Sequence, residues 1–209
     1  MKIAQITALG PVMPVIVIHQ AEQVLGLADA LLEGGIRGIE ITLRTAAALP
    51  AIETIARNRP EMVVGAGTVI DAATARAAKA AGAVFAVSPG STKSLIEACG
   101  EQALPLLPGA ATVSEMLALY EQGFEQLKFF PASQAGGTAF LRALQSPLPQ
   151  LQFCPTGGIT QETAPDWLSL ANVPCLGGSW IASADHIAAG DFAGITRRAA
   201  AATQLAGEE

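Results

Sequence analysis

The chain alternates between short apolar runs rich in Val, Ile and Phe and longer Ala-rich segments whose apolar positions recur every three or four residues. The short runs predict buried strands, and the longer period predicts amphipathic helices. The predicted strands cover residues 12–18, 36–43, 62–65, 84–87, 103–107, 124–130, 151–154 and 173–176. The predicted helices lie between them at residues 22–33, 46–57, 72–81, 93–98, 114–121, 138–144 and 162–170.

Several predicted helices end at a glycine, the residue that most easily adopts the positive φ often needed just after a helix. We expect this conformation at Gly34, Gly82, Gly100 and Gly123. The segment before Pro11 predicts one further, short helix at the N-terminus.

Strand and helix alternate along the whole chain without a linker, which predicts one α/β domain over residues 1–209 with a parallel sheet. Two architectures fit this order: an open doubly wound sheet and a closed (β/α)8 barrel. About eight strands, spaced by about 20 to 27 residues, favour the barrel. The 209 residues are fewer than the ~250 typical of that fold. The short N-terminal helix would then cap the bottom of the barrel.

Composition narrows the class of protein. Hydrophobic residues make up 51% and charged residues 14% of the chain, which excludes a disordered or fibrous protein. The formal net charge of -6 argues against nucleic acid or an anionic membrane as a partner, but it permits a small anionic substrate held by a few local positive groups. The sequence lacks the pattern of a secretory signal and any apolar run of membrane-spanning length, so we expect a cytoplasmic protein.

Cysteine and histidine content argues against a disulfide framework or a metal mechanism. Cys99, Cys154 and Cys175 are widely spaced without a CxxC pair, and we expect the last two to be small core residues in strands. The two histidines are too few and too far apart to predict a metal site. His19 follows the first predicted strand, within reach of the mouth, and His186 is expected at the surface.

One of the four lysines, Lys128, lies inside a predicted strand. Alternation along residues 124–130 points Gln126, Lys128 and Phe130 toward the interior of a barrel. Burial disfavours the charged ammonium, so an amine in this position can serve as a nucleophile toward a carbonyl group. The alternative is a structural ion pair with a carboxylate.

The second predicted strand supplies further inward polar groups. Alternation along residues 38–45 points Glu40, Thr42 and Arg44 inward or toward the mouth. Glu40 can pair with Lys128 or move protons for it, and the planar guanidinium of Arg44 suits a carboxylate. A buried network of these charged groups without chemistry remains the alternative.

Glycine-rich turns follow several predicted strands. The turns at 155–158 and 177–179 come after the last two strands, where barrels of this kind bring backbone N–H groups together to bind phosphate. The turn at 65–68 is not a dinucleotide-binding fingerprint, because Ile70 occupies the place of its last glycine.

The chain from about Pro11 to Trp180 resembles the class I 2-keto-3-deoxy-6-phosphogluconate (KDPG) aldolases, a family that also includes enzymes cleaving 4-hydroxy-2-oxoglutarate, and seven motifs in order carry the resemblance. The motifs are GIEITLRT (38–45), VGAGTV (64–69), VSPG (87–90), LPG (107–109), LKFFPA (127–132), FCPTGGI (153–159) and GGSW (177–180). The resemblance implies a (β/α)8 barrel, a homotrimer, and cleavage of KDPG to pyruvate and glyceraldehyde 3-phosphate in the Entner-Doudoroff pathway.

The resemblance also implies roles for individual residues. Lys128 would form the Schiff base and Glu40 would be the general acid and base. The substrate-binding residues would be Arg44 and Thr68 at the carboxylate, Pro89 and Phe130 beside the substrate, and Thr156, Gly157, Gly158, Gly178 and Ser179 at the phosphate. No metal or other cofactor is expected, because the protonated imine supplies the positive charge. One departure is His19, which stands where many relatives have Lys or Arg.

Three alternative functions stay open at this point. The first is an aldolase for the phosphogalactonate isomer, whose family is similar. The second is a phosphate-binding barrel enzyme in which Lys128 acts only through its charge. The third is a sugar-phosphate binding protein without catalysis.

Overall fold

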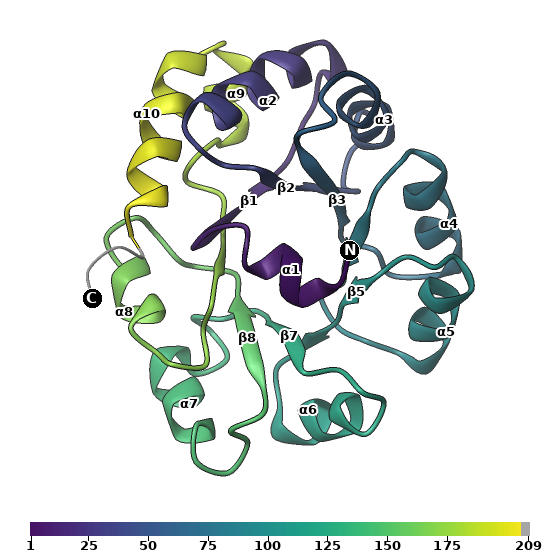
Figure 1. Ribbon diagram of the computed structural model, residues 1–209, viewed down its shortest axis with the longest axis vertical. Helices are drawn as coiled ribbons and strands as arrows, with labels where there is room; N and C mark the ends of the chain where they lie inside the picture. Colours follow the sequence, from purple (N-terminus) through teal and green to yellow (C-terminus); the bar gives the residue numbers. More distant parts are fainter. Residues whose placement is uncertain (206–209) are drawn as a thin grey trace.

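The computed structural model describes residues 1–205 as an α/β fold in which parallel strands lie inside a ring of helices (Figure 1). The strands are β1 (Val12–Ile16), β2 (Gly38–Thr42), β3 (Val63–Gly67), β4 (Phe85–Val87), β5 (Leu106–Leu107), β6 (Gly109–Ala110), β7 (Gln126–Phe129), β8 (Gln152–Pro155) and β9 (Leu176–Gly178). The helices are α1 (Ile3–Thr7), the 3-10 helix η1 (Ala21–Gln23), α2 (Val24–Glu33), α3 (Ala48–Asn58), α4 (Ala72–Ala80), α5 (Lys93–Glu101), α6 (Val113–Tyr120), α7 (Gly137–Leu144), α8 (Ala164–Leu168), α9 (Ala184–Ala188) and α10 (Phe192–Thr203).

The strands form two curled parallel sheets. One has the order β5-β4-β3-β2-β1-β9 and the other the order β6-β7-β8. Lys128 on β7 stands in register between Gly109 on β6 and Cys154 on β8. Parallel pairing places the carboxyl ends of all these strands at one edge, so residues just after each strand meet there.

Each of the eight predicted strands differs from the observed one by one to three residues at one end or both, and β6 was not predicted. The limits of β3, β9 and β5 are examples. β3 extends to Gly67, and β9 covers 176–178 instead of 173–176 because Val173 still closes a turn, its N–H donating to the Leu170 carbonyl at 2.9 Å. The expected strand 103–107 contributes only Leu106–Leu107, since Ala103 has φ 46 and belongs to the turn that ends α5. The apolar runs therefore located the strands but not their ends.

Only two of the four glycines expected to adopt positive φ at a helix end do so, although α2 does end just before Gly34 as expected. Gly82 and Gly123 have φ of 94 and 88, as predicted. Gly34 has φ -76, and Gly35 turns the chain instead with φ 86. A Cβ on Gly34 would lie 2.4 Å from the Cβ of Ala199, so Gly34 allows α2 and α10 to pack closely. Gly100 lies within α5, which continues to Glu101.

Apolar side chains fill both sides of the strands. Ile39 and Ile41 on β2 and Leu127 and Phe129 on β7 are fully buried in the cluster that packs against the helices. A second, smaller buried cluster consists of Ile6, Met13, Phe85, Val87, Leu107, Cys154 and Cys175. Helix α1, the expected short N-terminal helix, lies across the middle of the two curled sheets in Figure 1, and its Ile6 joins this cluster.

Within residues 1–205, no helix combines the length and apolar character needed to cross a bilayer.

Candidate active site

A cavity of about 320 Å³ opens where the carboxyl ends of the strands meet. Its lining consists of Val15, Glu40, Thr42, Arg44, Thr68, Pro89, Lys128, Phe130, Thr156, Gly157, Gly158, Ile159, Gly177 and Ser179. Every site residue predicted from the sequence lies there except Gly178. The volume is within the range of about 300–1,000 Å³ that holds small ligands.

Lys128 and Glu40 form a buried pair in the wall of this cavity. The Lys128 Nζ lies 3.5 Å from Glu40 Oε1, and the two side chains are 7% and 4% exposed. The same Nζ lies 5.4 Å from the centroid of the Phe130 ring, where an ammonium is attracted by the ring face. Gln126, the other residue expected to point inward on β7, is half-buried and outside the cavity lining.

The side chain of Glu40 lies across β3, at Gly67. A Cβ on Gly67 would be 2.0 Å from Glu40 Oε1, so the absence of a side chain at this position makes room for the carboxylate. The neighbouring Gly65 makes room in the same way for the ring of Phe85. The two glycines of the 64–69 motif therefore make room for side chains that pack against β3.

Arg44 is separate from the buried pair. Its Nε donates to Thr42 Oγ1 at 3.2 Å, and that hydroxyl donates to the Ile16 carbonyl at 2.8 Å. Arg44 takes part in none of the salt bridges found among residues 1–205. The three-membered ion network considered from the sequence is thus reduced to the Lys128–Glu40 pair, and the exposed guanidinium can receive an anionic ligand.

Thr68 reaches the cavity from a strained backbone. Its φ of 60 lies in the left-handed region, which costs a residue with a Cβ about 1 kcal/mol or more. The conformation follows directly after the end of β3 and places Thr68 in the lining beside Arg44. Strain of this kind persists where the surrounding structure fixes it, and functional sites are common examples.

The glycine turn after β8 forms another part of the rim. Gly157 and Gly158 have φ of 109 and 74, and the carbonyls of Thr156 and Gly157 accept from Ala132 and Ser133 at 2.9 and 3.1 Å. Their carbonyls are therefore turned toward the segment after β7. Gly157 and Gly158 lie after the end of β8, and among the described residues their backbone N–H groups donate no hydrogen bond to a backbone carbonyl in a turn or loop. Such N–H groups can bind an anion.

The turn after β9 contributes Gly177 and Ser179 to the lining rather than Gly178. A Cβ on Gly178 would lie 2.3 Å from the Trp180 ring, so this residue faces the helix layer. A Cβ on Gly177 would meet the Thr156 hydroxyl at 2.3 Å. Sequence reasoning missed Gly177 because the predicted strand ended at residue 176. The alternation of inward and outward positions therefore did not extend to it. It also missed Val15 and Ile159, which are ordinary apolar residues.

The histidines lie outside the cavity lining. His19 is exposed, and His186, expected at the surface, is partly exposed, with a buried Nδ1 that lacks a partner among residues 1–205. The described residues contain no cluster of three His, Cys, Asp or Glu side chains that could hold a metal ion.

The three cysteines are buried. The hydrogen bond with Cys154, together with burial, raises the pKa of the Cys175 thiol well above its usual value. Burial also raises the pKa of the Cys99 thiol. Because the thiolate is the reactive form, these two thiols are poor nucleophiles, in agreement with the expected role of Cys175 as a core residue.

The chain is similar to known proteins in both sequence and structure. Residues 3–198 match the family model described as KDPG and KHG aldolase. The KHG/KDPG aldolase of Escherichia coli K12 is 45% identical over 199 residues, which cover 95% of this chain and 93% of that protein.

Two solved structures are similar over almost their whole length. The KDPG aldolase of Legionella pneumophila, with pyruvate captured at low pH as a covalent carbinolamine intermediate, has 42% identity and a TM-score of 0.95, covering 97% of this chain and 98% of that one. The KDPG aldolase of Zymomonas mobilis ZM4 with 3-phosphoglycerate has 41% identity and a TM-score of 0.91, covering 97% and 95%.

Proposed function

Because the chain belongs to the KDPG and KHG aldolase family, we propose that it is a class I aldolase that cleaves KDPG to pyruvate and glyceraldehyde 3-phosphate through a Schiff base on Lys128. The observation that carries the proposal is the Lys128–Glu40 pair, buried in the wall of a cavity that also contains an unpaired guanidinium and two glycine turns. An amine shielded from water beside an acid has the two groups that imine chemistry needs.

The first half of the reaction forms the imine. The neutral amine of Lys128 attacks the C2 ketone, and the resulting carbinolamine loses water to give a protonated imine. Glu40, 3.5 Å from Nζ, supplies the proton that leaves with the hydroxyl. The carbinolamine captured in the Legionella relative is the intermediate that this step forms.

The second half breaks the C3–C4 bond. Glu40 takes the proton of the C4 hydroxyl, directly or through water, while the C3–C4 electron pair moves into the imine and glyceraldehyde 3-phosphate is released. The enamine left on Lys128 gains a proton at C3, and water then hydrolyses the imine to release pyruvate and the free amine. Phe130 packs beside the reacting carbons and helps to exclude water from them.

The two ends of the substrate are held by different elements. Arg44 and Thr68, after β2 and β3, bind the carboxylate next to C2. Thr156, Gly157, Gly158 and Ser179, after β8 and β9, receive the phosphate on backbone N–H and hydroxyl groups. Gly178 then contributes through its backbone alone.

The proposal includes a complete (β/α)8 barrel as the scaffold. An isolated bridge between Thr156 and Gly177 joins β8 to β9, and Pro108 alone separates β5 from β6, with its carbonyl accepting from the Lys128 N–H at 2.8 Å. These links support closure of the two sheets into one ring. We further infer a single domain over residues 1–209 from the unbroken alternation of strand and helix, and a cytoplasmic location from the lack of a signal pattern. A homotrimer and a place in the Entner-Doudoroff pathway are inferred from the family resemblance.

Trapping with pyruvate and borohydride tests the proposal. Reduction of the imine should leave a stable adduct on Lys128, found by mapping the modified peptide. Lys128→Met should give no adduct and no cleavage of KDPG while keeping the wild-type circular dichroism spectrum. Lys93→Met is the control, because Lys93 is 85% exposed and pairs only with Glu97 on the same helix. An unmodified wild-type protein, or near-normal turnover in Lys128→Met, would contradict the covalent mechanism.

Substrate choice needs a separate measurement. Initial rates on KDPG, on its phosphogalactonate epimer and on 4-hydroxy-2-oxoglutarate distinguish the proposed activity from that of the sister family. We expect KDPG to be preferred and 4-hydroxy-2-oxoglutarate to be cleaved more slowly, because it carries no phosphate for the glycine turns. Sugar-phosphate binding without turnover on all three compounds would instead favour a binding protein.

A further inference from the structure

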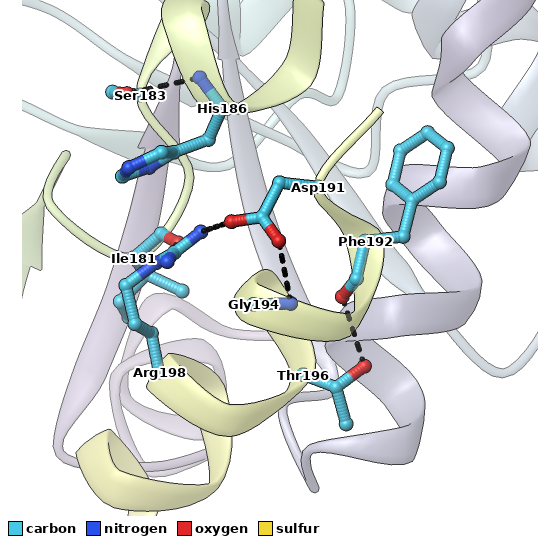
Figure 2. A network of polar contacts seen from close by, with 8 residues as sticks. All are labelled: Ile181, Ser183, His186, Asp191, Phe192, Gly194, Thr196 and Arg198. Atoms are coloured by element: carbon cyan, nitrogen blue, oxygen red, sulfur yellow. Dashed lines mark hydrogen bonds and ion pairs between the residues drawn. The ribbon is translucent and has the colours of Figure 1, made fainter. Parts of the chain in front are cut away.

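Arg198 on α10 connects the segment after β9 to the start of its own helix. Its Nε donates to the Ile181 carbonyl at 2.9 Å, and its Nη2 donates to Asp191 Oδ2 at 3.1 Å. Figure 2 shows the guanidinium between these two partners, one in the loop that follows β9 and the other at the start of α10. Two donors of one planar group thus fix two elements relative to each other.

The Ile181 carbonyl belongs to the chain that carries the rim of the cavity. Ile181 is fully buried and follows Ser179 by two residues, with Trp180 between them. A buried carbonyl without a donor loses its hydrogen bond to water and gains nothing in return. Arg198 supplies that donor, and the bond holds the segment at a point close to Ser179.

Asp191 anchors the other side of the guanidinium. Its Oδ1 accepts from the Gly194 N–H at 3.0 Å and so caps α10, and a Cβ on Gly194 would lie 2.0 Å from Oδ2. The hydrogen bond from Arg198 holds the pKa of Asp191 below its ordinary value of 3.8, so the carboxylate stays ionised at neutral pH. The carboxylate therefore accepts from α10 at two places and fixes the direction of the guanidinium.

We propose that Arg198 is a positioning residue for the phosphate subsite: by holding the Ile181 carbonyl it sets the place of Ser179 at the cavity rim. This inference rests on the proposed function, since it concerns the phosphate end of that substrate. Arg198 is not part of the cavity lining and does not touch the substrate. Its effect reaches the ligand through the backbone of residues 179–181.

The proposed effect is confined to one end of the cavity. The Schiff-base lysine is on β7, and Arg44 and Thr68 follow β2 and β3, so none of these groups lies on the segment that Arg198 holds. Loss of Arg198 should therefore weaken the binding of phosphorylated ligands and leave imine formation with pyruvate unchanged. A purely structural role would lower the activity on all substrates together.

The test compares KDPG with 4-hydroxy-2-oxoglutarate in Arg198→Ala. We expect KM for KDPG to rise about tenfold, the size of one lost charge-assisted hydrogen bond, while kcat changes less than about twofold. KM for 4-hydroxy-2-oxoglutarate and the rate of pyruvate trapping should stay at the wild-type value. Inhibition by inorganic phosphate should weaken in parallel with KDPG binding.

Arg59→Ala is the matched control. Arg59 pairs with Asp29, and its side chain is 27% exposed compared with 24% for Arg198, but the pair lies away from the cavity lining. This variant should keep the wild-type KM for both substrates. If Arg198→Ala does not fold, Arg198→Lys keeps the charge with one donor group in place of the planar fork, and its KM for KDPG should rise by a smaller factor.

The outcomes separate the two proposals. A wild-type protein without a pyruvate adduct or KDPG cleavage would overturn the proposed function, whatever Arg198 does. The positioning role alone would be overturned if the wild-type protein cleaves KDPG and the Arg198 variants lose activity equally on both substrates. It would also be overturned if these variants lose activity on neither substrate.

Discussion

Gly67→Ala is the substitution that most directly tests the placement of Glu40. The new Cβ would lie 2.0 Å from Glu40 Oε1 and 2.7 Å from its Cδ and Cγ. Ordinary contact between such atoms begins at about 3.5 Å, so the carboxylate must move by about 1.5 Å. That shift changes the contact with Lys128 Nζ, which is 3.5 Å long in the native arrangement.

The expected loss of activity follows from that displacement. A misplacement of about 1 Å costs about 100-fold in rate, and general acid–base groups contribute about 100-fold to 10,000-fold. We therefore expect kcat/KM for KDPG to fall about 100-fold in Gly67→Ala, equivalent to about 2.7 kcal/mol. Overpacking should also lower the free energy of unfolding by about 1–3 kcal/mol.

A matched variant on the same strand separates the two effects. In Gly65→Ala the three atoms nearest to the new Cβ all belong to the Phe85 ring, the first at 2.2 Å, so the overpacking of β3 falls on Phe85 rather than on the Glu40 carboxylate. Pyruvate release, coupled to NADH oxidation by lactate dehydrogenase, gives the activity, and urea denaturation gives the stability. We expect similar losses of stability in both variants but a large loss of kcat/KM only in Gly67→Ala. Equal activity in the two variants would refute the reasoning.

Three further predictions concern strain, titration and thiol reactivity. Thr68→Gly should unfold at a urea concentration no lower than Thr68→Ala, because glycine relieves the strain at φ 60, while both variants raise KM for KDPG. Hydrogen bonds from Thr74, first from its backbone N–H, hold the pKa of Asp71 below 3.8, so its stabilisation is complete above that pH and is lost as pH falls through the folded pKa. Urea midpoints of wild type and Asp71→Asn should therefore depend differently on pH below about 4, and identical profiles would contradict this linkage. DTNB at pH 8 should modify none of the three buried thiols of the native protein, Cys99, Cys154 and Cys175. After unfolding in urea it should modify all three.

The resemblance of seven collinear motifs identifies the family from the sequence alone, and the family comparisons confirm it. Local periodicity also placed the strands and helices, because the face of an element depends on spacing that a short window contains. The limits of β3, β5 and β9 were less accurate, since strand ends depend on partners elsewhere in the chain. Gly34 and Gly100 show the same limit. Gly34 allows two helices to pack closely, and Gly100 lies inside a helix with no atom near the place of a Cβ, so neither has the positive φ that the pattern predicts.

By itself, the sequence determined which residues face inward: Glu40 on one strand and Lys128 on another, each fixed by the two-residue period of its own strand. Only the tertiary structure decided that these residues, 88 positions apart, come within 3.5 Å while Arg44 stays outside the pair. It also decided that Gly67 makes room for the carboxylate, that Gly177 lines the cavity in place of Gly178, and that Arg198 reaches Ile181. The physical reason is that local spacing sets the direction of a side chain, whereas the distance between two side chains depends on sheet curvature and rotamers, which the packing of the whole molecule fixes.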